Sequence, residues 1–211
     1  MRLTKYAHAC IVLEEQGQKL VIDPGGFTPT FGDAEHIAAV VVTHAHPDHF
    51  DPGHLQRIVD QNPKARIFTT EEAARNFQKP NTVIVDDGDE HTAGLFALHF
   101  SGKQHAVIHP DWPGLHNTGV RVNNTFYYGG DSFTPSGEPV DVLAVPSSAP
   151  WMKISEAMDF LAAVRPKRCI PTHNALLSAE GHAVTNRWLG EMCEKHGIGF
   201  MYLQPGESID L

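Results

Sequence analysis

The sequence predicts an α+β fold in which two β-sheets pack face to face and helices cover their outer surfaces. Short apolar runs typical of strands are followed by amphipathic stretches typical of helices, and this order occurs twice along the chain. The hydrophobic content of 41% is ordinary for a globular protein with a sizeable core. A chain of 211 residues suits one large domain, so we expect residues 1–211 to form a single unit.

The first half of the chain begins with a predicted β-hairpin. Residues 10–13 and 19–22 are apolar apart from Lys19, and the turn-like Gln16-Gly17-Gln18 lies between them. The run Val40-Val41-Val42 is apolar on both faces and predicts a central strand. Asp51-Pro52 predicts the N-cap and first position of a helix that ends near Gln61. Further expected elements are strands at 66–68, 83–85, 96–98 and 106–108, and a helix that opens at Thr70.

The second half repeats this plan. Asn123-Asn124 is typical of a tight hairpin turn between strands at 120–122 and 126–128. Ser178 and Gly197 predict the two ends of a long helix. The remaining expected elements are a buried strand at 142–145, a helix at 154–164, and short strands at 169–170 and 201–203.

Four candidate metal ligands lie within the six residues His44-Ala45-His46-Pro47-Asp48-His49, directly after the apolar run 40–42. Imidazole and carboxylate groups are ligands for borderline metals such as Zn²⁺. The order of strand, ligand loop and capped helix gives these ligands a rigid support. The stretch therefore predicts a metal site that could hold two ions, and a pair of ions generates hydroxide near neutral pH.

This H-x-H-x-D-H pattern resembles the metallo-β-lactamase superfamily. The resemblance covers nearly the whole chain and implies an αββα four-layer sandwich with two mixed sheets. It also implies three later ligands, of which the last two match Gly130-Asp131 and Pro171-Thr172-His173, each after a predicted strand. In this family one metal would be held by His44, His46 and a third histidine, the other by Asp48, His49 and His173, and Asp131 would bridge them.

Two histidines compete for the third ligand position, His105 and His109. The family spacing resembles Gly-x-x-His, which Gly102-Lys103-Gln104-His105 matches. We therefore expect His105 to be the ligand and His109 to lie on a loop at the rim of the site. The candidates for hydrogen bonds that orient the ligands are Asp23, Thr43 and Thr172.

Tyr6-Ala7-His8-Ala9 resembles the Gly-His-Ala/Ser element of the lactonase-like branch of this superfamily, which includes ascorbate-6-phosphate lactonase. Ala7 stands where the branch has Gly. Asp23-Pro24 resembles the Asp-Pro turn of the same branch. The resemblance implies a catalytic role for His8 beside Asp48 and Asp131, and a hydrogen-bonded histidine outside the reaction is the alternative.

The expected reaction is attack by a metal-bridging hydroxide on a small ester, lactone or phosphoester. Zn²⁺ is the expected metal, with Mn²⁺ and Fe²⁺ as alternatives. The flavo-diiron branch has Glu where this chain has His46, which favours hydrolysis over redox chemistry. A phosphodiesterase for cyclic nucleotides or other small substrates would use the same metals, and a non-catalytic metal-binding module is a further alternative.

Aromatic residues in loops after the strands could form the wall of a substrate pocket, namely Phe27, Phe31, Trp112 and Trp151. Lys153 and Arg121 are candidates for holding an anionic group of a substrate, although ordinary surface cations are the simpler interpretation. Ser147-Ser148 could donate hydrogen bonds into the site.

The composition restricts partners and compartment. The formal net charge of −9 argues against nucleic acids and anionic membranes, which need clustered Lys and Arg. Three cysteines without a C-x-x-C pair, and an N-terminus interrupted by Glu14-Glu15, indicate a reducing, cytoplasmic location. Fourteen histidines against 16 Lys and Arg indicate metal or proton chemistry. We expect a small-molecule substrate and leave open a homo-oligomer.

Overall fold

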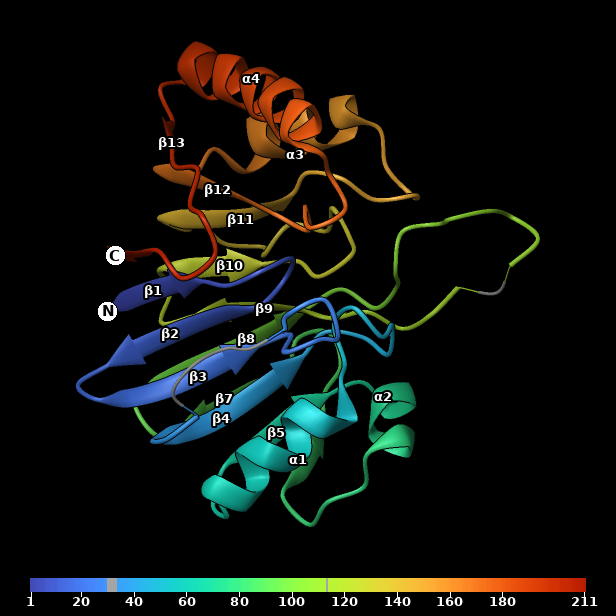
Figure 1. Ribbon diagram of the computed structural model, residues 1–211, viewed down its shortest axis with the longest axis vertical. Helices are drawn as coiled ribbons and strands as arrows, with labels where there is room; N and C mark the ends of the chain where they lie inside the picture. Colours follow the sequence, from blue (N-terminus) through green and yellow to red (C-terminus); the bar gives the residue numbers. More distant parts are fainter. Residues whose placement is uncertain (30–33, 113) are drawn as a thin grey trace.

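Two seven-stranded β-sheets form the centre of the protein in a computed structural model that describes residues 1–29, 34–112 and 114–211 (Figure 1). The first sheet contains, in spatial order, β14 (Ser208–Asp210), β1 (Arg2–Lys5), β2 (Ile11–Glu15), β3 (Gln18–Ile22), β4 (Ile37–Val42), β5 (Arg66–Thr69) and β6 (Thr82–Ile84). The second contains β13 (Gly199–Phe200), β12 (Arg168–Thr172), β11 (Val142–Pro146), β10 (Phe126–Tyr128), β9 (Gly119–Val122), β8 (Phe96–Ser101) and β7 (Glu90–Ala93).

The helices lie outside the two sheets and complete four layers. In Figure 1, α1 (Pro52–Gln61) and α2 (Glu71–Asn76) lie beside the first sheet, and α3 (Ile154–Val164) and α4 (Ala179–His196) lie beside the second. Leu55 and Ile58 of α1 belong to one apolar cluster with Val40 and Val42 of β4. A separate cluster joins the second sheet to α3 and α4. The predicted αββα sandwich is therefore confirmed.

The main core fills the space between the sheets. Successive side chains of a strand point to opposite faces, so Ile11 and Leu13 of β2 lie in the central cluster while Val12 faces the α1 layer. Phe100 and Phe126 reach the same central cluster from the second sheet. Burial of each such side chain stabilises the fold by about 1.5–3 kcal/mol.

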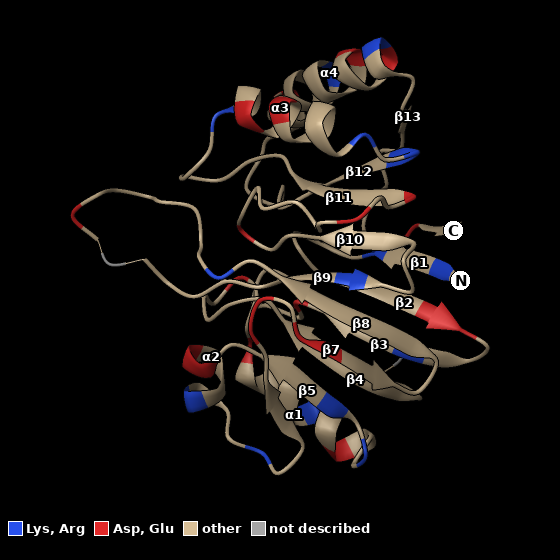
Figure 2. Cartoon of the chain, turned by 180° about the vertical axis from the view of Figure 1, so that it is seen from behind, with Lys and Arg blue, Asp and Glu red and all other residues tan. Residues whose placement is uncertain are grey.

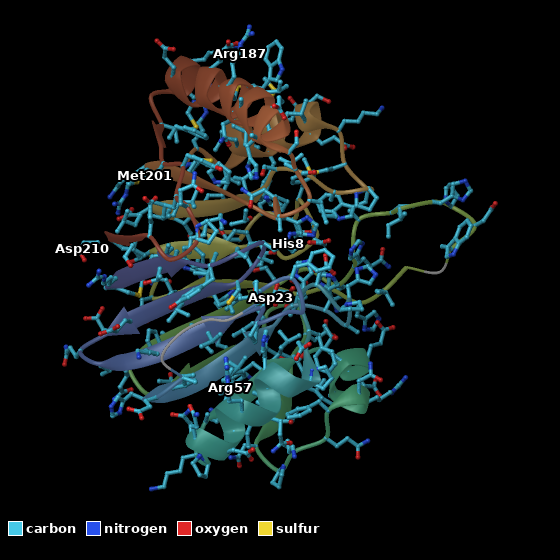
Figure 3. All side chains as sticks on the ribbon, in the orientation of Figure 1. His8, Asp23, Arg57, Arg187, Met201 and Asp210 are labelled. Atoms are coloured by element: carbon cyan, nitrogen blue, oxygen red, sulfur yellow. The ribbon has the colours of Figure 1, made fainter. Side chains whose placement is uncertain are left out.

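Parallel strands gather the functional loops at one edge. The strands from β3 to β6 pair in parallel, and so do those from β10 to β13. The carboxyl ends of parallel strands share an edge, and the loops beyond that edge are where such sheets bind ligands. Figure 3 labels His8 and Asp23 at this edge and Asp210 at the opposite one.

Most expected elements and caps are confirmed. Asn123 and Asn124 have φ angles of 48° and 52°, as a two-residue hairpin turn requires. The Asp51 carboxylate accepts the N–H of His54 at 2.8 Å and begins α1. Gly197 ends α4 in the left-handed conformation.

Two expected strands are wrong. Residues 106–108 form an irregular loop, because the N–H of Ala106 donates to the carbonyl of Asp131 and the side chains of Val107 and Ile108 are 66% and 50% exposed. Residues 201–203 are also irregular, since pairing along β12 ends at Phe200. The strands β1, β7 and β14 were not expected, because their sequences are short and largely polar. Within the described part of the chain, no helix has the length and apolar character needed to cross a membrane.

Candidate metal centre

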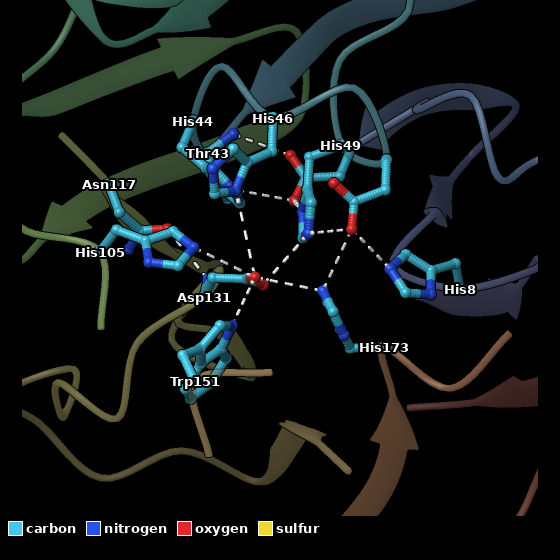
Figure 4. A network of polar contacts seen from close by, with 12 residues as sticks. His8, Thr43, His44, His46, His49, His105, Asn117, Asp131, Trp151 and His173 are labelled. Atoms are coloured by element: carbon cyan, nitrogen blue, oxygen red, sulfur yellow. Dashed lines mark hydrogen bonds and ion pairs between the residues drawn. The ribbon is translucent and has the colours of Figure 1, made fainter. Parts of the chain in front are cut away.

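The seven predicted ligands come together at the carboxyl edge of the sheets (Figure 4). They form two adjacent groups, and the ligand atoms within each group lie within 4.8 Å of one another. The first group contains His44, His46, His105 and Asp131, and the second contains His8, Asp48, His49 and His173. This grouping agrees with the division between two metals implied by the resemblance, with His8 added to the second group.

Asp131 lies between the two groups. Its Oδ1 is 3.1 Å from Nε2 of His49, and its Oδ2 is 3.1 Å from Nε2 of His173. The same Oδ2 is 3.3 Å from Nε2 of His105 and 4.0 Å from Nε2 of His44. One carboxylate therefore faces histidines of both groups, which is the position that a bridging ligand requires.

Hydrogen bonds on the outer side of the imidazole rings fix which nitrogen faces the centre. The acceptors carry no hydrogen, so each Nδ1 must donate, and in the neutral ring Nε2 is the atom with a lone pair for a metal. These bonds run from His49 to Asp23 Oδ2 (2.7 Å), from His105 to the carbonyl of Ala106 (2.5 Å), and from His173 to the carbonyl of Ser148 (2.6 Å).

The inward-facing atoms lack hydrogen bonds. Nε2 of His49, His105 and His173 and Oδ1 of Asp131 are buried without a hydrogen-bond partner, although they lie close to one another. Their short mutual contacts are electrostatic and lack the directions of a hydrogen bond. An unsatisfied buried polar group costs about 1–3 kcal/mol. Divalent cations in the two groups would satisfy these four atoms, so these residues fit a metal centre.

The carboxylates at the centre stay ionised. Burial acts to raise the pKa of Asp131, but the charge of His49 lowers it well below its usual range. Burial also acts to raise the pKa of Asp48, and the neighbouring His173 and the hydrogen bond with His8 lower it below its ordinary value. Two negative charges therefore remain in a buried site.

Two histidines respond to these charges. Burial opposes the charged form of His173, but the neighbouring Asp131 and Asp48 raise its pKa to about 9. Against the same effect of burial, Asp131 and Asp23 raise the pKa of His49 well above its usual value. Without metal, protons on these imidazoles supply the positive charge that the carboxylates require, and a cation would replace them.

Asp23 and Thr43 support the ligands as the sequence predicted. Asp23 is fully buried, and its carboxylate accepts the backbone N–H and the hydroxyl of Thr43 as well as His49 Nδ1, each at 2.7 Å. The third candidate, Thr172, has a buried hydroxyl without a hydrogen bond, so it orients no ligand. Ser148 acts through its backbone carbonyl, not through its hydroxyl.

Two residues that hold Asp131 were not assigned that role from the sequence. The indole Nε1 of Trp151 donates to Asp131 Oδ2 at 2.8 Å, and Asn117 Oδ1 accepts the Asp131 N–H at 3.0 Å. Trp151 was expected only as a pocket wall. Asn117 lies at the end of a long loop, and no motif marks it.

His8 contacts the site through Asp48. Its Nδ1 accepts the N–H of Ala175 at 3.3 Å, so the proton resides on Nε2, which donates to Asp48 Oδ2 at 3.0 Å. Burial lowers the pKa of His8 to about 4, so the ring is neutral at physiological pH. His8 is 1% exposed and fixes the orientation of a ligand carboxylate.

Two glycines and several strained residues shape the ligand loops. A Cβ on Gly25 would lie 1.8 Å from the carbonyl oxygen of Asp48, so only glycine lets these loops approach. Gly130 has a φ of 64°, and a Cβ there would lie 2.3 Å from Asn117 Oδ1. Positive φ angles occur at His8, Asp23 and His173, and such strain is characteristic of functional sites.

The geometry separates the two candidates for the third histidine. His105 is 6% exposed and belongs to the first group of ligands. The side chain of His109 is 54% exposed, and its Nδ1 accepts the N–H of Asp111 at 3.2 Å. His109 therefore lies on the rim, as expected.

Two cavities adjoin the centre. The first, of about 510 Å³, is lined by Asp48, Asp131 and His173 and by the expected Phe27 and Trp151. The second, of about 710 Å³, is lined by His46, His105 and the expected Trp112, among others. Neither Lys153 nor Arg121 lines these cavities, and Phe31 lies outside the described residues.

Comparison with known proteins agrees with this geometry. The family described as "Beta-lactamase superfamily domain" matches residues 2–173. Protein Rv0786c of Mycobacterium tuberculosis is 36% identical and covers 99% of this chain and 98% of its own length. A UPF0173 metal-dependent hydrolase of Carboxydothermus hydrogenoformans is 26% identical over 100% of both chains. The chain therefore belongs to the β-lactamase superfamily.

The fold itself serves more than one chemistry. The crystal structure of CmlA, a diiron β-hydroxylase from Streptomyces venezuelae, has a TM-score of 0.77 and 16% identity, covering 100% of this chain and 54% of that one. Fold alone therefore does not decide the reaction, and the ligands and cavities of this chain must.

Proposed function

We propose that the protein is a metal-dependent hydrolase with a two-ion centre. His44, His46 and His105 hold one ion, Asp48, His49 and His173 hold the other, and Asp131 joins them. The observation that carries this proposal is the convergence of buried, unpaired Nε2 atoms on the Asp131 carboxylate, with their tautomers fixed from outside. The hydrolase relative in Carboxydothermus hydrogenoformans supports it.

The metal pair supplies hydroxide near neutral pH and polarises the bond to be cleaved. The protein's own residues hold the two carboxylates in place for that reaction. Trp151 holds the carboxylate of Asp131 and Asn117 holds its backbone N–H, while the neutral His8 holds the carboxylate of Asp48. We therefore assign His8 a positioning role, because it lines neither cavity and acts through a ligand.

Zn²⁺ is the metal that we propose. Five imidazoles and two carboxylates suit Zn²⁺, although Fe²⁺ and Mn²⁺ also bind such groups. His46 stands where the flavo-diiron proteins have Glu, and this difference favours hydrolysis. A small ester or lactone in the first cavity would lie against Asp48 and Asp131, which line it. Phosphodiester hydrolysis is the competing activity, because the same centre would serve it.

The test combines metal content with loss of function. Elemental analysis of purified protein should find two divalent ions per chain, and the loaded protein should hydrolyse a small ester or lactone. Asp131→Asn and His49→Ala should each lose most activity and metal while keeping the circular dichroism spectrum of the fold. Asp111→Asn, an exposed control, should change neither. Full activity in Asp131→Asn would refute the two-ion centre.

A further inference from the structure

The first cavity adjoins a second one beside the loop of residues 102–118, which projects from the sandwich. His46 and Ile108 line both cavities. The second cavity extends away from the centre along apolar side chains, which are Ala106, Val107, Ile108, Trp112 and Leu115. Its volume of about 710 Å³ is in the range of small-molecule sites. The centre therefore has an apolar extension on its His46 and His105 side.

No Lys or Arg side chain lines either cavity in the part of the chain that the structure describes. Residues 102–118 contain two charged side chains, Lys103 and Asp111, and the ribbon of this loop is almost free of blue and red in Figure 2. Lys103 Nζ lies 3.5 Å from Asp86 Oδ2 and is engaged outside the cavities. A negatively charged group placed away from the metals would meet no counter-charge here.

Large apolar side chains surround the mouths of both cavities. Val107, Ile108 and Trp112 are 66%, 50% and 69% exposed, and Phe27 and Leu176 across the first cavity are 40% and 72% exposed. Phe27, Ile108 and Leu176 line the first cavity, while Val107 and Trp112 line the second. Exposed apolar side chains gathered at the mouth of a cavity mark a binding site. An apolar ligand would cover it.

We infer that the substrate is a neutral carboxyl ester or lactone that carries an apolar chain of several carbons. The ester group occupies the first cavity, against Asp48 and Asp131, and the chain occupies the second, between Val107 and Leu115. This inference rests on the proposed hydrolase function and specifies its substrate. Each methylene group that enters the second cavity should raise kcat/KM about fourfold, the factor that corresponds to its removal from water.

The first experiment measures chain-length dependence with Zn²⁺-loaded protein. One series runs from p-nitrophenyl acetate to octanoate, a second from ethyl to octyl acetate, and bis(p-nitrophenyl) phosphate serves as the anionic comparison. We expect kcat/KM to rise at least tenfold along one series and to exceed that for the phosphodiester. A flat profile in both series, or preference for the phosphodiester, would overturn the inference.

A matched pair of variants locates the chain. Val107→Asp places a charge in the second cavity, and it should lower the octanoate-to-acetate ratio of kcat/KM at least tenfold. Val184→Asp on α4 is the control, because Val184 is also exposed, at 58%, and lines neither cavity. An equal ratio in the two variants would contradict the assignment of the second cavity.

A binding measurement separates this inference from the proposed function. Octanamide is neutral and is not an ester, so calorimetry with metal-free protein reports the cavity alone. It should bind more tightly than acetamide, and Val107→Asp should weaken it at least tenfold while Val184→Asp does not. If the Zn²⁺-loaded protein cleaves no ester but octanamide still binds, ester hydrolysis is refuted. The assignment of the second cavity then remains valid. Equal binding of the two amides would overturn the cavity assignment itself.

Discussion

Replacing Asp23 with Asn should weaken metal binding although Asp23 is not a ligand. The carboxylate presents Oδ1 to the N–H of Thr43, and Oδ2 to the Thr43 hydroxyl and to His49 Nδ1, all at 2.7 Å. An amide has one oxygen, which must accept the Thr43 N–H. Its NH₂ group then faces His49 Nδ1, and the imidazole must move its proton to Nε2. That nitrogen is the one aimed at Asp131, so the variant protonates the ligand atom.

The size of the effect follows from the bond that is lost. A charge-assisted hydrogen bond contributes about 1.5–3 kcal/mol, and the carboxylate is fully buried, so water does not replace it. Loss of such a partner of a metal-bound histidine typically lowers metal affinity about 10–100-fold, which is about the same energy. We therefore expect a Zn²⁺ dissociation constant about 10–100-fold above that of the unmodified protein.

Competition with a chromophoric chelator measures this constant. Asp60→Asn is the matched control, because Asp60 is on the exposed side of α1 and accepts a hydrogen bond from the exposed side chain of Gln56. The control should bind Zn²⁺ like the unmodified protein. Affinity in Asp23→Asn within about threefold of the control would show that the tautomer of His49 is not set by Asp23, and the reasoning would fail.

Three further predictions concern the same centre. Gly25→Ala should lower both metal content and unfolding temperature, because its Cβ would overlap the Asp48 carbonyl at 1.8 Å; unchanged values would refute the close approach. His105→Ala should lose metal by elemental analysis while His109→Ala keeps it, and the reverse result would overturn the ligand choice. Zn²⁺ affinity should rise with pH up to about 9, because His173 is protonated below its pKa of about 9 and must release that proton. Calorimetry in buffers of different ionisation enthalpy should detect proton release at pH 7, and none would contradict this.

The sequence predicted the layers because hydrophobic periodicity reports burial directly. The strand at Val40-Val41-Val42 and the helix after Asp51 carry strong local signals and are as expected. Residues 106–108 look equally strand-like, yet the N–H of Ala106 bonds the carbonyl of Asp131 in a loop, and periodicity cannot report which partner a segment finds. The strands β1 and β14 depend on each other across the whole chain, through pairs such as Leu3 with Ile209. Local patterns do not show such pairing.

The structure brings the residues predicted as ligands together, whereas the residues that support them were largely not predicted. The hexapeptide at 44–49 is marked by its own pattern of histidines and a carboxylate, and the resemblance to the superfamily marks Asp131 and His173, each after a strand. Asn117 and the indole of Trp151 reach Asp131 from loops whose positions depend on tertiary structure. The carbonyls that fix His105 and His173 belong to the backbone, which no residue type reveals.

The ligand set is divided between the two halves of the chain, and this division links metal binding to the cooperative unfolding of the two halves. The loop at 44–49 extends from the first sheet, whereas Asp131 and His173 extend from the second. Bound metal would therefore link the two sheets of the sandwich. At free metal about 100-fold above the dissociation constant, this linkage adds about 2.7 kcal/mol to the free energy of unfolding. Depletion of the metal would thus remove the activity of the protein and lower its free energy of unfolding at the same time.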